Sequence, residues 1–343
     1  MTVNAILNKD IVDFVNQFPL KDKIEHTKFL ITGATGLIGS IMIHSLIAMN
    51  LDINIISPVR NLRKALGMFN ENEIKHIEFL ECDLSSFDYD KIGAVDFIVH
   101  CAAPTASKYF VEHPVETFNC IVKGTQQLLE YARYNQIKSF VYLSSLEVYG
   151  TISDDFKFIK EDYQGYVDPM SGRSSYPIAK RASENLCISY FLEYNVPVRI
   201  ARLTQTTGAG VAEDDNRVIV QFSRLASQRK DIILHSLGNS ARPYCYTIDC
   251  INAILYILLK GNSGEAYNVA NEDTYISAKD LAFYIKENFS PGINVKVDID
   301  ETRGYAPETK IKLSTGKLNQ LGWRPIYTLH DILEHVIASL KNI

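Results

Sequence analysis

The chain has 343 residues, with 35 basic and 40 acidic side chains and a formal net charge of −5. At about 150 residues per domain, this length predicts roughly two domains, or one large α/β unit with an appended lobe. A chain of this size buries a core without disulfide or metal staples. The mild acidity provides no broad basic surface, so we expect no nucleic-acid partner.

Six cysteines are scattered along the chain, with no Cys-x-x-Cys pair and no Cys/His spacing typical of zinc. We therefore expect reduced, mostly buried thiols and no metal. The first residues lack the basic-then-apolar order of a signal peptide. No apolar run approaches the roughly 20 residues of a membrane-spanning helix. These features favour a soluble, cytoplasmic protein with no membrane partner.

The first 27 residues are polar and mildly helical, and we interpret residues 1–27 as an N-terminal arm. From residue 28 onward, short apolar runs rich in β-branched residues alternate with helical patterns. This alternation is typical of a parallel sheet that is covered on both faces. The predicted strands are residues 28–32, 53–56, 76–80, 95–100 and 140–143, and the predicted helices are residues 37–49 and 115–135.

The order of elements becomes less regular in the second half of the chain. The predicted helices are residues 176–194, 218–228, 277–287 and 328–340, and the predicted strands are residues 196–203, 232–234 and 266–269. We expect the irregular part to form a smaller lobe over the carboxyl edge of the sheet. No internal repeat and no low-complexity linker separates it from the first half.

A glycine-rich loop follows the first predicted strand, with glycines at every third position. In such strand–loop–helix turns, glycines allow a tight turn, close approach of a pyrophosphate and close packing of the helix on the sheet. The start of the helix then presents free N–H groups to the phosphates. A plain strand-to-helix turn is the alternative, but the loop heads an α/β series, which favours dinucleotide binding. The expected contacts are Gly33, Thr35, Gly36, Leu37, Ile38 and Gly39.

The type of dinucleotide stays open between NAD and NADP. The acid expected about 20 residues after the loop, which binds a ribose 2′-hydroxyl, is missing. Arg60 ends the second strand and either holds the 2′-phosphate of NADP or lies in a solvated loop. Asp83 either hydrogen-bonds the adenine or forms a turn. Leu84 and Ala102, which follow the third and fourth strands, are further cofactor-binding candidates.

Tyr176 and Lys180 form a Tyr-x-x-x-Lys pair, and this spacing places both side chains on one face of a helix. A lysine ammonium beside a phenol favours the phenolate, so the tyrosine becomes a usable base. Such spacing is common by chance, but here it follows a glycine loop and a strand that ends at Ser145. This order favours catalysis. His100 ends an apolar strand and is expected to be a core or loop histidine.

Together these motifs resemble the extended short-chain dehydrogenase/reductase family of NAD-dependent epimerases and dehydratases, which modifies nucleotide sugars. The resemblance rests on TGATGLIG (32–39), HCAAP (100–104), SSLEVYG (144–150), YPIAK (176–180), RPYCYTIDC (242–250), GEAYNVAN (264–271) and LGWRP (321–325). Residues 161–186 are most similar to the UDP-glucuronate decarboxylase-like group. The resemblance implies a Rossmann-type doubly wound α/β fold. Residues 28–182 would form the dinucleotide-binding domain, and residues 183–343 the interleaved final strands and a smaller C-terminal substrate-binding lobe.

The resemblance also implies roles for individual residues. Tyr176 takes the proton from a sugar hydroxyl, typically at C4, and Ser145 orients that hydroxyl. Lys180 holds the nicotinamide ribose and lowers the pKa of Tyr176, while Glu147 is an auxiliary acid or base. A tightly bound NAD or NADP is reduced and then reoxidised within one turnover. The implied substrate contacts are Pro104, Glu147, Arg173, Gln205, Arg217 and Arg242. The implied partners are a nucleotide-diphosphate sugar and a second copy of the chain in a homodimer.

Several positions depart from the family pattern. Dehydratases resemble one another in an Asp-Glu pair where this chain has Leu146-Glu147, and a leucine has no proton to give to a leaving hydroxyl. Leu146 departs from the Ser-Glu of the decarboxylases as well. Gln205 replaces an asparagine of the decarboxylase group, and Ile121 replaces an asparagine that belongs to a polar relay. Substrate and outcome can therefore differ from the parent activity.

We therefore favour a decarboxylase-like reaction on UDP-glucuronate or a related nucleotide-linked uronic acid. A nucleotide-sugar epimerase is the second reading and a 4,6-dehydratase the third. All three begin with oxidation at C4, and the residues around the catalytic group choose among them. A non-catalytic NAD(P)-binding sensor is a function of a different class. The intact set of Ser145, Tyr176 and Lys180 disfavours it, because a sensor has no use for these residues.

Overall fold

The structure is a computed structural model that describes residues 4–105, 107–152, 158–300 and 308–341. Within these residues, a seven-stranded sheet has the order β10-β6-β5-β4-β1-β2-β3, and all neighbouring strands are parallel. Its strands are β1 (Thr27–Thr32), β2 (Ile53–Val59), β3 (Ile77–Glu81), β4 (Phe97–His100), β5 (Ser139–Ser145), β6 (Val198–Leu203) and β10 (Ala266–Val269).

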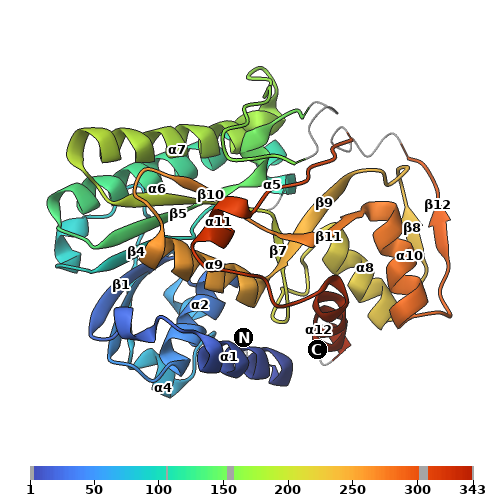
Figure 1. Ribbon diagram of the computed structural model, residues 1–343, viewed down its shortest axis with the longest axis horizontal. Helices are drawn as coiled ribbons and strands as arrows, with labels where there is room; N and C mark the ends of the chain where they lie inside the picture. Colours follow the sequence, from blue (N-terminus) through green and yellow to red (C-terminus); the bar gives the residue numbers. More distant parts are fainter. Residues whose placement is uncertain (1–3, 106, 153–157, 301–307, 342–343) are drawn as a thin grey trace.

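Helices cover both faces of this sheet (Figure 1). The helices on one face are α1 (Ala5–Gln17), α2 (Leu37–Ala48) and α9 (Thr247–Lys260), and those on the other are α6 (Pro114–Tyr134) and α7 (Ser175–Tyr194). The side chains of β1 divide accordingly. Phe29 and Ile31 enter the core beneath α2 and α9, whereas Leu30 enters the core beneath α6 and α7. Alternate residues of a strand point to opposite faces, so burial on both sides gives β1 its continuous apolar run.

The strand order reverses at β1, which lies between β4 and β2. The chain builds the sheet outward from β1 through β2 and β3, and then outward on the other side from β4. In doubly wound sheets, ligands bind in the crevice at the carboxyl ends of the strands at this point of reversal. The predicted doubly wound α/β fold is confirmed, and it places the glycine loop after β1 at the crevice.

A smaller lobe follows the carboxyl edge of the sheet, on the right in Figure 1. Its strands are β7 (Gln205–Thr207), β9 (Ala241–Tyr246) and β11 (Asn271–Ser277) in one sheet, and β8 (Ile232–Leu234) and β12 (Val295–Val297) in another. Its helices are α8 (Val218–Ser227), α10 (Ala278–Phe289) and α12 (Leu329–Lys341). Short connecting helices are α3 (Leu62–Leu66), α4 (Glu71–Ile74), α5 (Ser107–Glu112) and α11 (Gly316–Gln320).

The elements predicted from sequence all occur, with boundaries that differ by a few residues. Helix α9 and strands β7, β11 and β12 were not predicted. Helix α9 is largely buried, and it packs against α1, α2 and the sheet. Strand β11 pairs with β9 through an irregular register. A broken register weakens the alternation by which a strand is recognised in sequence.

The N-terminal segment is part of the main body. Asn4 caps helix α1 by accepting a hydrogen bond from the Leu7 amide at 2.8 Å. Leu7, Ile11 and Phe14 then lie in the same hydrophobic core as α2 and α9. Residues that we interpreted as an arm therefore include a docked helix, because its apolar face fits beside α2 and α9. The domain boundaries at residues 28 and 183 stay a prediction.

The six cysteines are free thiols. Cys187, Cys245 and Cys250 are buried, and the other three are half-buried. Among the residues that the structure describes, no helix has the length and apolar character that are needed to cross a membrane.

Candidate active site

The predicted catalytic pair lies in the first two turns of α7. The ring of Tyr176 is buried and stacks on the ring of Phe110 from α5, with centroids 4.3 Å apart and planes 7° apart. Pro177 follows, and proline suits the first turn of a helix because its missing N–H would have no intrahelical partner there. The stack fixes the plane of the phenol, so its hydroxyl has a defined position at the start of the helix.

Ser145 ends β5 and connects the strand to the catalytic phenol. Its Oγ accepts a hydrogen bond from the amide of Glu147 at 3.2 Å, which begins the short 3-10 helix Leu146–Tyr149. Burial raises the pKa of Tyr176 and the charge of Glu147 raises it further, whereas a hydrogen bond from Ser145 and the charge of Arg173 lower it. Ser145 is therefore placed to favour the phenolate, as a hydrogen-bond donor to it.

Lys180 lies one turn beyond Tyr176 and is buried. Its Nζ donates to the carbonyl of Leu143 in β5 at 2.7 Å and lies 5.8 Å from the centroid of the Tyr176 ring. Burial lowers the pKa of Lys180 to about 8, and the charge of Glu184 opposes this shift. Our prediction that Lys180 lowers the pKa of Tyr176 stays a prediction. In the structure the Lys180 ammonium donates to the strand, and the contributions that oppose the raised pKa of Tyr176 come from Ser145 and Arg173.

Glu147 and Arg173 form a two-pronged ion pair beside the phenol. Nη1 lies 3.1 Å from Oε2, and Nη2 lies 3.3 Å from Oε1. Both side chains are about one-third exposed, at 31% and 34%, so the pair is accessible from solvent. The guanidinium also lies 5.5 Å from the centroid of the Phe110 ring. A planar guanidinium binds carboxylates in this way, so Arg173 is suited to a second carboxylate as well.

Two apolar residues that depart from the family pattern have different surroundings. Ile121 packs with Phe110, Tyr176 and Ala179, and so forms part of an apolar wall behind the phenol. Leu146 is only 5% exposed and belongs to a separate core with Ile159 and Leu313. Position 146 therefore faces a hydrophobic core and supplies no proton donor.

The glycine loop between β1 and α2 has the geometry that a pyrophosphate requires. Gly33 has a φ of +79°, which favours glycine, and a β-carbon there would lie 3.0 Å from the amide nitrogen of Ala102. A β-carbon on Gly39 would lie 2.3 Å from the carbonyl oxygen of Gly33. Gly36 is the N-cap of α2, and no described side chain caps it. The uncapped N–H groups and the open glycine surface fit the phosphates of a dinucleotide.

Three other predicted cofactor residues act on one thiol. Burial raises the pKa of Cys120 in α6, Arg60 and Lys180 lower it, and Asp83 raises it. Arg60 and Asp83 are exposed at the ends of β2 and β3, whereas Lys180 is buried in α7. The charges of all three residues therefore reach Cys120, and their roles in cofactor binding stay predictions.

The remaining cofactor candidates border the same edge. Thr35, Leu37 and Ile38 are half-buried at the start of α2. The Cβ of Leu84 would lie 3.7 Å from a β-carbon on Gly124 of α6, so Leu84 lies against that helix. Ala102 lies against Gly33, as described above. Pro104 is half-buried next to Ala103, which packs against the cluster that contains Tyr176.

Gln205 lies just past the strand that neighbours Ser145. In the register of β5 and β6, Ser145 pairs with Leu203, so Gln205 emerges two residues beyond this pair. In the small lobe, Gln205 pairs with Tyr244 across β7 and β9. Its amide oxygen is buried and has no hydrogen-bond partner among the described residues. Buried acceptors normally have a partner, so this oxygen is suited to a donor group of a ligand.

Two predicted arginines also gather around Tyr244. Burial raises the pKa of Tyr244 to about 12, and the charges of Arg242 and Arg217 oppose the shift. Arg217 is the N-cap of α8 and is paired with Asp215, with Nε 3.0 Å from Oδ1. Arg242 donates from Nη2 to the hydroxyl of Thr309 at 3.4 Å. The structure thus groups Gln205, Arg217 and Arg242 in the small lobe, and Ser145, Glu147, Arg173, Tyr176 and Lys180 at the sheet.

Some residues around the site were not predicted. Arg202 of β6 forms a buried two-pronged ion pair with Glu184 of α7, at 2.7 and 3.0 Å. Its Nη1 also donates to the hydroxyl of Tyr149 at 3.1 Å. Glu184 follows Lys180 by four residues, so the sequence indicates that both lie on one face of α7. No sequence pattern indicates that Glu184 pairs with Arg202 on β6. Phe110 was also missed, because stacking on Tyr176 depends on how α5 is placed.

His100 behaves as the predicted core histidine. It is 2% exposed, and its Nδ1 lies 2.7 Å from the hydroxyl of Thr32 on the neighbouring strand. Burial lowers the pKa of His100 to about 3, and the charge of Lys180 lowers it further. The imidazole is therefore neutral at physiological pH.

The fold and the family profile define a class of protein, a Rossmann-type enzyme that uses NAD or NADP, and Tyr176 and Lys180 stay its predicted catalytic pair. More particularly, the chain belongs to the NAD dependent epimerase/dehydratase family, whose sequence profile matches residues 29–270.

Known proteins with related sequences carry decarboxylase names. The chain is 28% identical to UDP-glucuronic acid decarboxylase 3 of Arabidopsis thaliana over 312 residues, which cover 89% of this chain and 86% of that protein. It is 26% identical to UDP-glucuronic acid decarboxylase 1 of Xenopus tropicalis, with 96% of this chain and 76% of that protein covered.

Solved structures with the same fold include enzymes of other activities. One is a UDP-glucuronic acid 4-epimerase from Bacillus cereus in complex with UDP-glucuronic acid and NAD, with a TM-score of 0.78, 22% identity, and coverage of 92% of this chain and 99% of that one. Another is a dTDP-glucose 4,6-dehydratase from Streptomyces venezuelae, with a TM-score of 0.76, 22% identity, and coverage of 92% and 97%. At these identities the likeness concerns the fold.

Proposed function

We propose that the chain modifies a nucleotide-linked sugar through transient oxidation at C4, and that its main reaction is decarboxylation of a nucleotide-linked uronic acid such as UDP-glucuronate. One observation carries this proposal. The phenol of Tyr176, which serves oxidation of an alcohol and whose pKa Ser145 lowers, lies beside the Glu147–Arg173 pair, which provides both a guanidinium for a carboxylate and an acid or base.

The first step is removal of a proton from the C4 hydroxyl. Ser145 orients this hydroxyl and donates to the phenolate form of Tyr176, which takes the proton. Since burial raises the Tyr176 pKa, the opposing contributions of Ser145 and Arg173 decide how readily the phenolate forms. The bound nicotinamide supplies the chemistry of hydride acceptance and return. The hydrogen bond from Lys180 to the Leu143 carbonyl fixes the ammonium group within 5.8 Å of the centroid of the Tyr176 ring.

The second step depends on the group at C5. Oxidation at C4 to a ketone turns a sugar with a carboxylate on C5 into a β-keto acid. The C5–C6 bond then breaks and CO2 leaves, and the electron pair of this bond forms an enolate over C5, C4 and the C4 oxygen. Glu147, whose side chain is 31% exposed, is placed to pass a proton from solvent to C5 of this enolate. Arg173 is placed to receive the carboxylate of the incoming sugar, because its guanidinium already binds a carboxylate, that of Glu147. The Gln205, Arg217 and Arg242 group is assigned to the nucleotide diphosphate and sugar.

The surroundings of position 146 support decarboxylation over dehydration. Elimination of a C6 hydroxyl needs a proton donor next to Glu147. Leu146 occupies that sequence position and is buried in a core with Ile159 and Leu313. The related decarboxylases, although below 30% identity, point the same way.

Epimerisation is the second candidate, and the same arginine favours it. A carboxylate that stays bound to Arg173 is stabilised as an anion, which opposes its loss as CO2. The keto sugar then returns to an alcohol with inverted or retained configuration at C4. Whether Arg173 releases the carboxylate therefore decides between the two outcomes.

The deciding experiment incubates the cofactor-loaded protein with UDP-, dTDP-, CDP- and GDP-linked sugars, including UDP-glucuronate, and analyses the products by mass spectrometry. We expect loss of the mass of CO2 from a uronic acid. An unchanged mass with a changed configuration would establish epimerisation, and loss of the mass of water would establish dehydration. If no sugar nucleotide turned over and Tyr176→Phe altered nothing measurable, we would abandon the enzyme hypothesis in favour of a non-catalytic NAD(P)-binding sensor.

The choice of cofactor belongs to the same proposal. The exposed side chain of Arg60 at the end of β2 supports a contact with the 2′-phosphate of NADP. Measured affinities for NAD and NADP should therefore differ in favour of NADP, and Arg60→Ala should remove the difference. An unchanged preference in the variant would remove Arg60 from the cofactor site.

We also propose that the protein forms a homodimer through α6 and α7. These helices pack together, and their exposed large side chains include Tyr134 and Leu192. Sedimentation of the wild type and of Leu192→Asp tests this proposal, which fails if both sediment as monomers. The cytoplasmic location stays a prediction.

A further inference from the structure

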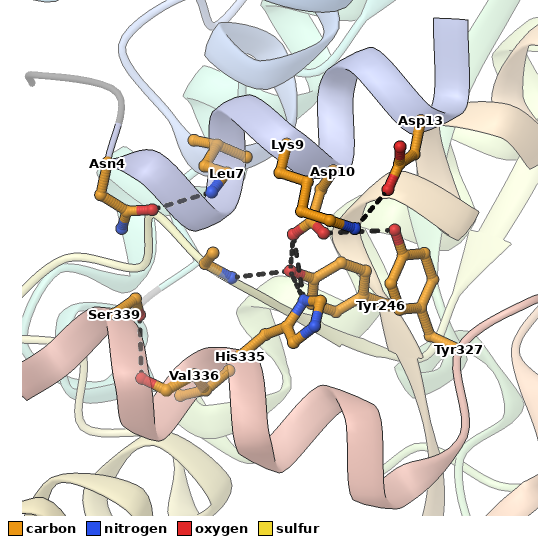
Figure 2. Close-up of polar contacts among 11 residues, drawn as sticks. Asn4, Leu7, Lys9, Asp10, Asp13, Tyr246, Tyr327, His335, Val336 and Ser339 are labelled. Carbon is orange, nitrogen blue, oxygen red and sulfur yellow. Dashed lines mark hydrogen bonds and ion pairs between the residues drawn. The ribbon is translucent and has the colours of Figure 1, made fainter. Parts of the chain in front are cut away.

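A buried carboxylate outside the candidate active site joins the two ends of the chain (Figure 2). Asp10 of α1 is 1% exposed. It accepts hydrogen bonds from the hydroxyls of Tyr246 and Tyr327, and it lies 3.1 Å from Nδ1 of His335. We call these four residues the Asp10 cluster. A buried carboxylate is costly unless it is hydrogen-bonded, so these three partners hold α1 firmly in place.

The Asp10 cluster gathers segments that are far apart in sequence. Tyr246 ends β9, Tyr327 precedes α12, and His335 lies in α12. The rings pack on one another, with centroids 4.2 Å apart for the two tyrosines and 5.5 Å apart for Tyr246 and His335. Asp10, Tyr327 and His335 lie outside residues 29–270, which match the family profile, whereas Tyr246 lies within them.

The cluster reaches the small lobe through Tyr246. The hydroxyl of Tyr246 donates a hydrogen bond to Asp10. Its oxygen also accepts a hydrogen bond from the amide of Ala209 at 3.3 Å. Gly208 packs so tightly here that a β-carbon would lie 2.9 Å from the Tyr246 ring and from the hydroxyl of Thr247. The first residues of the segment 208–217 are therefore held in place by contacts with Tyr246.

The other end of this segment is the start of α8. Arg217 caps α8, pairs with Asp215, and donates from Nη1 to the carbonyl of Thr206. Helix α8 in turn packs against α12, which carries His335 (Figure 1). Both ends of the segment 208–217 thus depend on elements that meet at Asp10.

We propose that Asp10 is a positioning residue for the substrate side of the site. Through Tyr246 and His335 it fixes the segment 208–217, and with it Arg217, without itself touching a ligand. The inference rests on the proposed function only in taking Arg217 as a contact of the nucleotide-sugar. Asp10→Asn should loosen this segment and weaken binding of the nucleotide part, while it leaves the cofactor loop unchanged.

The test compares the wild type with Asp10→Asn, Tyr246→Phe and the control Asp13→Asn. Asp13 lies on the same helix, but its side chain is 43% exposed and pairs with the exposed Lys9 at 2.7 Å. Hydrogen–deuterium exchange with mass spectrometry follows the backbone of residues 208–217 and of the glycine loop, 33–39. Calorimetry measures the affinities of the cofactor-loaded protein for UDP and of the unloaded protein for the dinucleotide.

We expect exchange in residues 208–217 to accelerate about tenfold or more in Asp10→Asn and Tyr246→Phe, since hydrogen bonds to a charged group are the stronger ones. Exchange in the glycine loop and dinucleotide affinity should stay within about twofold, and UDP affinity should fall about tenfold. Asp13→Asn should match the wild type. Where a substrate turns over, KM rises and kcat is retained.

Unchanged exchange at 208–217 in both variants would overturn the inference. Equal acceleration at 33–39 would also overturn it, since Asp10 would then support the whole fold and not one segment. Tyr246→Phe keeps the ring and removes only the hydroxyl, so it decides the matter if Asp10→Asn does not fold. Failure of the wild type to bind UDP would contradict the proposed function, whereas the exchange data would still decide the role of Asp10.

Discussion

Replacing Glu184 by Gln removes one charge from a buried ion pair that links α7 to β6. Glu184 and Arg202 are 10% and 9% exposed, and two hydrogen bonds of 2.7 and 3.0 Å join them. The remaining partners of the guanidinium are the hydroxyl of Tyr149 and the carbonyl of Glu161, and neither carries a formal charge. Glutamine has nearly the same shape as glutamate, so the variant removes the charge and one hydrogen-bond acceptor without opening a cavity.

The expected cost follows from burial. Removing one partner of a buried ion pair costs about 3–5 kcal/mol, because the other charge remains uncompensated away from water. For 343 residues, the entropy of unfolding is about 0.7 kcal/mol per kelvin near the midpoint. The midpoint of thermal unfolding should therefore fall by about 4–7 °C.

Circular dichroism or calorimetry measures this midpoint for the wild type, Glu184→Gln, Arg202→Gln and the double variant. The control is Asp13→Asn, since Asp13 pairs with Lys9 at 2.7 Å and its side chain is 43% exposed, and such pairs contribute at most about 1 kcal/mol. The double variant should lose less than the sum of the two single variants, because it leaves no uncompensated charge. A midpoint within about 1 °C of the wild type in Glu184→Gln, or strictly additive losses, would refute the reasoning.

Three other predictions follow from single contacts. Tyr176→Phe should lower turnover by about 10²–10⁴ while dinucleotide affinity stays within about twofold, and equal loss of both would contradict a catalytic role. Gly39→Ala should weaken dinucleotide binding in calorimetry by about tenfold or more, because a β-carbon would lie 2.3 Å from the Gly33 carbonyl, whereas Gly36→Ala meets only a 3.4 Å contact and should lose less. Burial raises the pKa of Asp249 to about 7, so the folded state keeps a proton that the unfolded state releases near pH 4. The stability of the wild type relative to Asp249→Asn should then fall from about pH 4 to pH 7 in urea titrations and level off above, and a constant difference would exclude this titration.

The parts of the site that the sequence predicted are those with local signals. The glycine loop lies between an apolar strand and a helix, so Gly33, Gly36 and Gly39 identify themselves by spacing and context. Tyr176 and Lys180 are four residues apart on one helix. Such patterns survive without knowledge of the fold, since each depends on a single turn or helix.

The parts that the sequence did not predict are contacts between distant segments. Glu147 and Arg173 are 26 residues apart, and no periodicity connects a 3-10 helix after β5 with the turn before α7. Asp10 and His335 are 325 residues apart, in segments at opposite ends of the chain.

This division between local and distant signals also explains why the class of the enzyme is easier to infer than its reaction. Oxidation at C4 requires Ser145, Tyr176 and Lys180, which two neighbouring elements supply. The fate of the ketone depends on what lies beside C5, and there the guanidinium of Arg173 has to choose between the carboxylate of Glu147 and that of the sugar. In the proposed function, return of the guanidinium to Glu147 after the ketone has formed would leave the sugar carboxylate without its counter-ion, so that it would leave more readily as CO2. If the sugar carboxylate stayed on Arg173, it would be retained, and the charge of Glu147 beside the phenol would raise the pKa of Tyr176. The balance within this ion pair is therefore our proposed basis for the choice between lyase and isomerase chemistry.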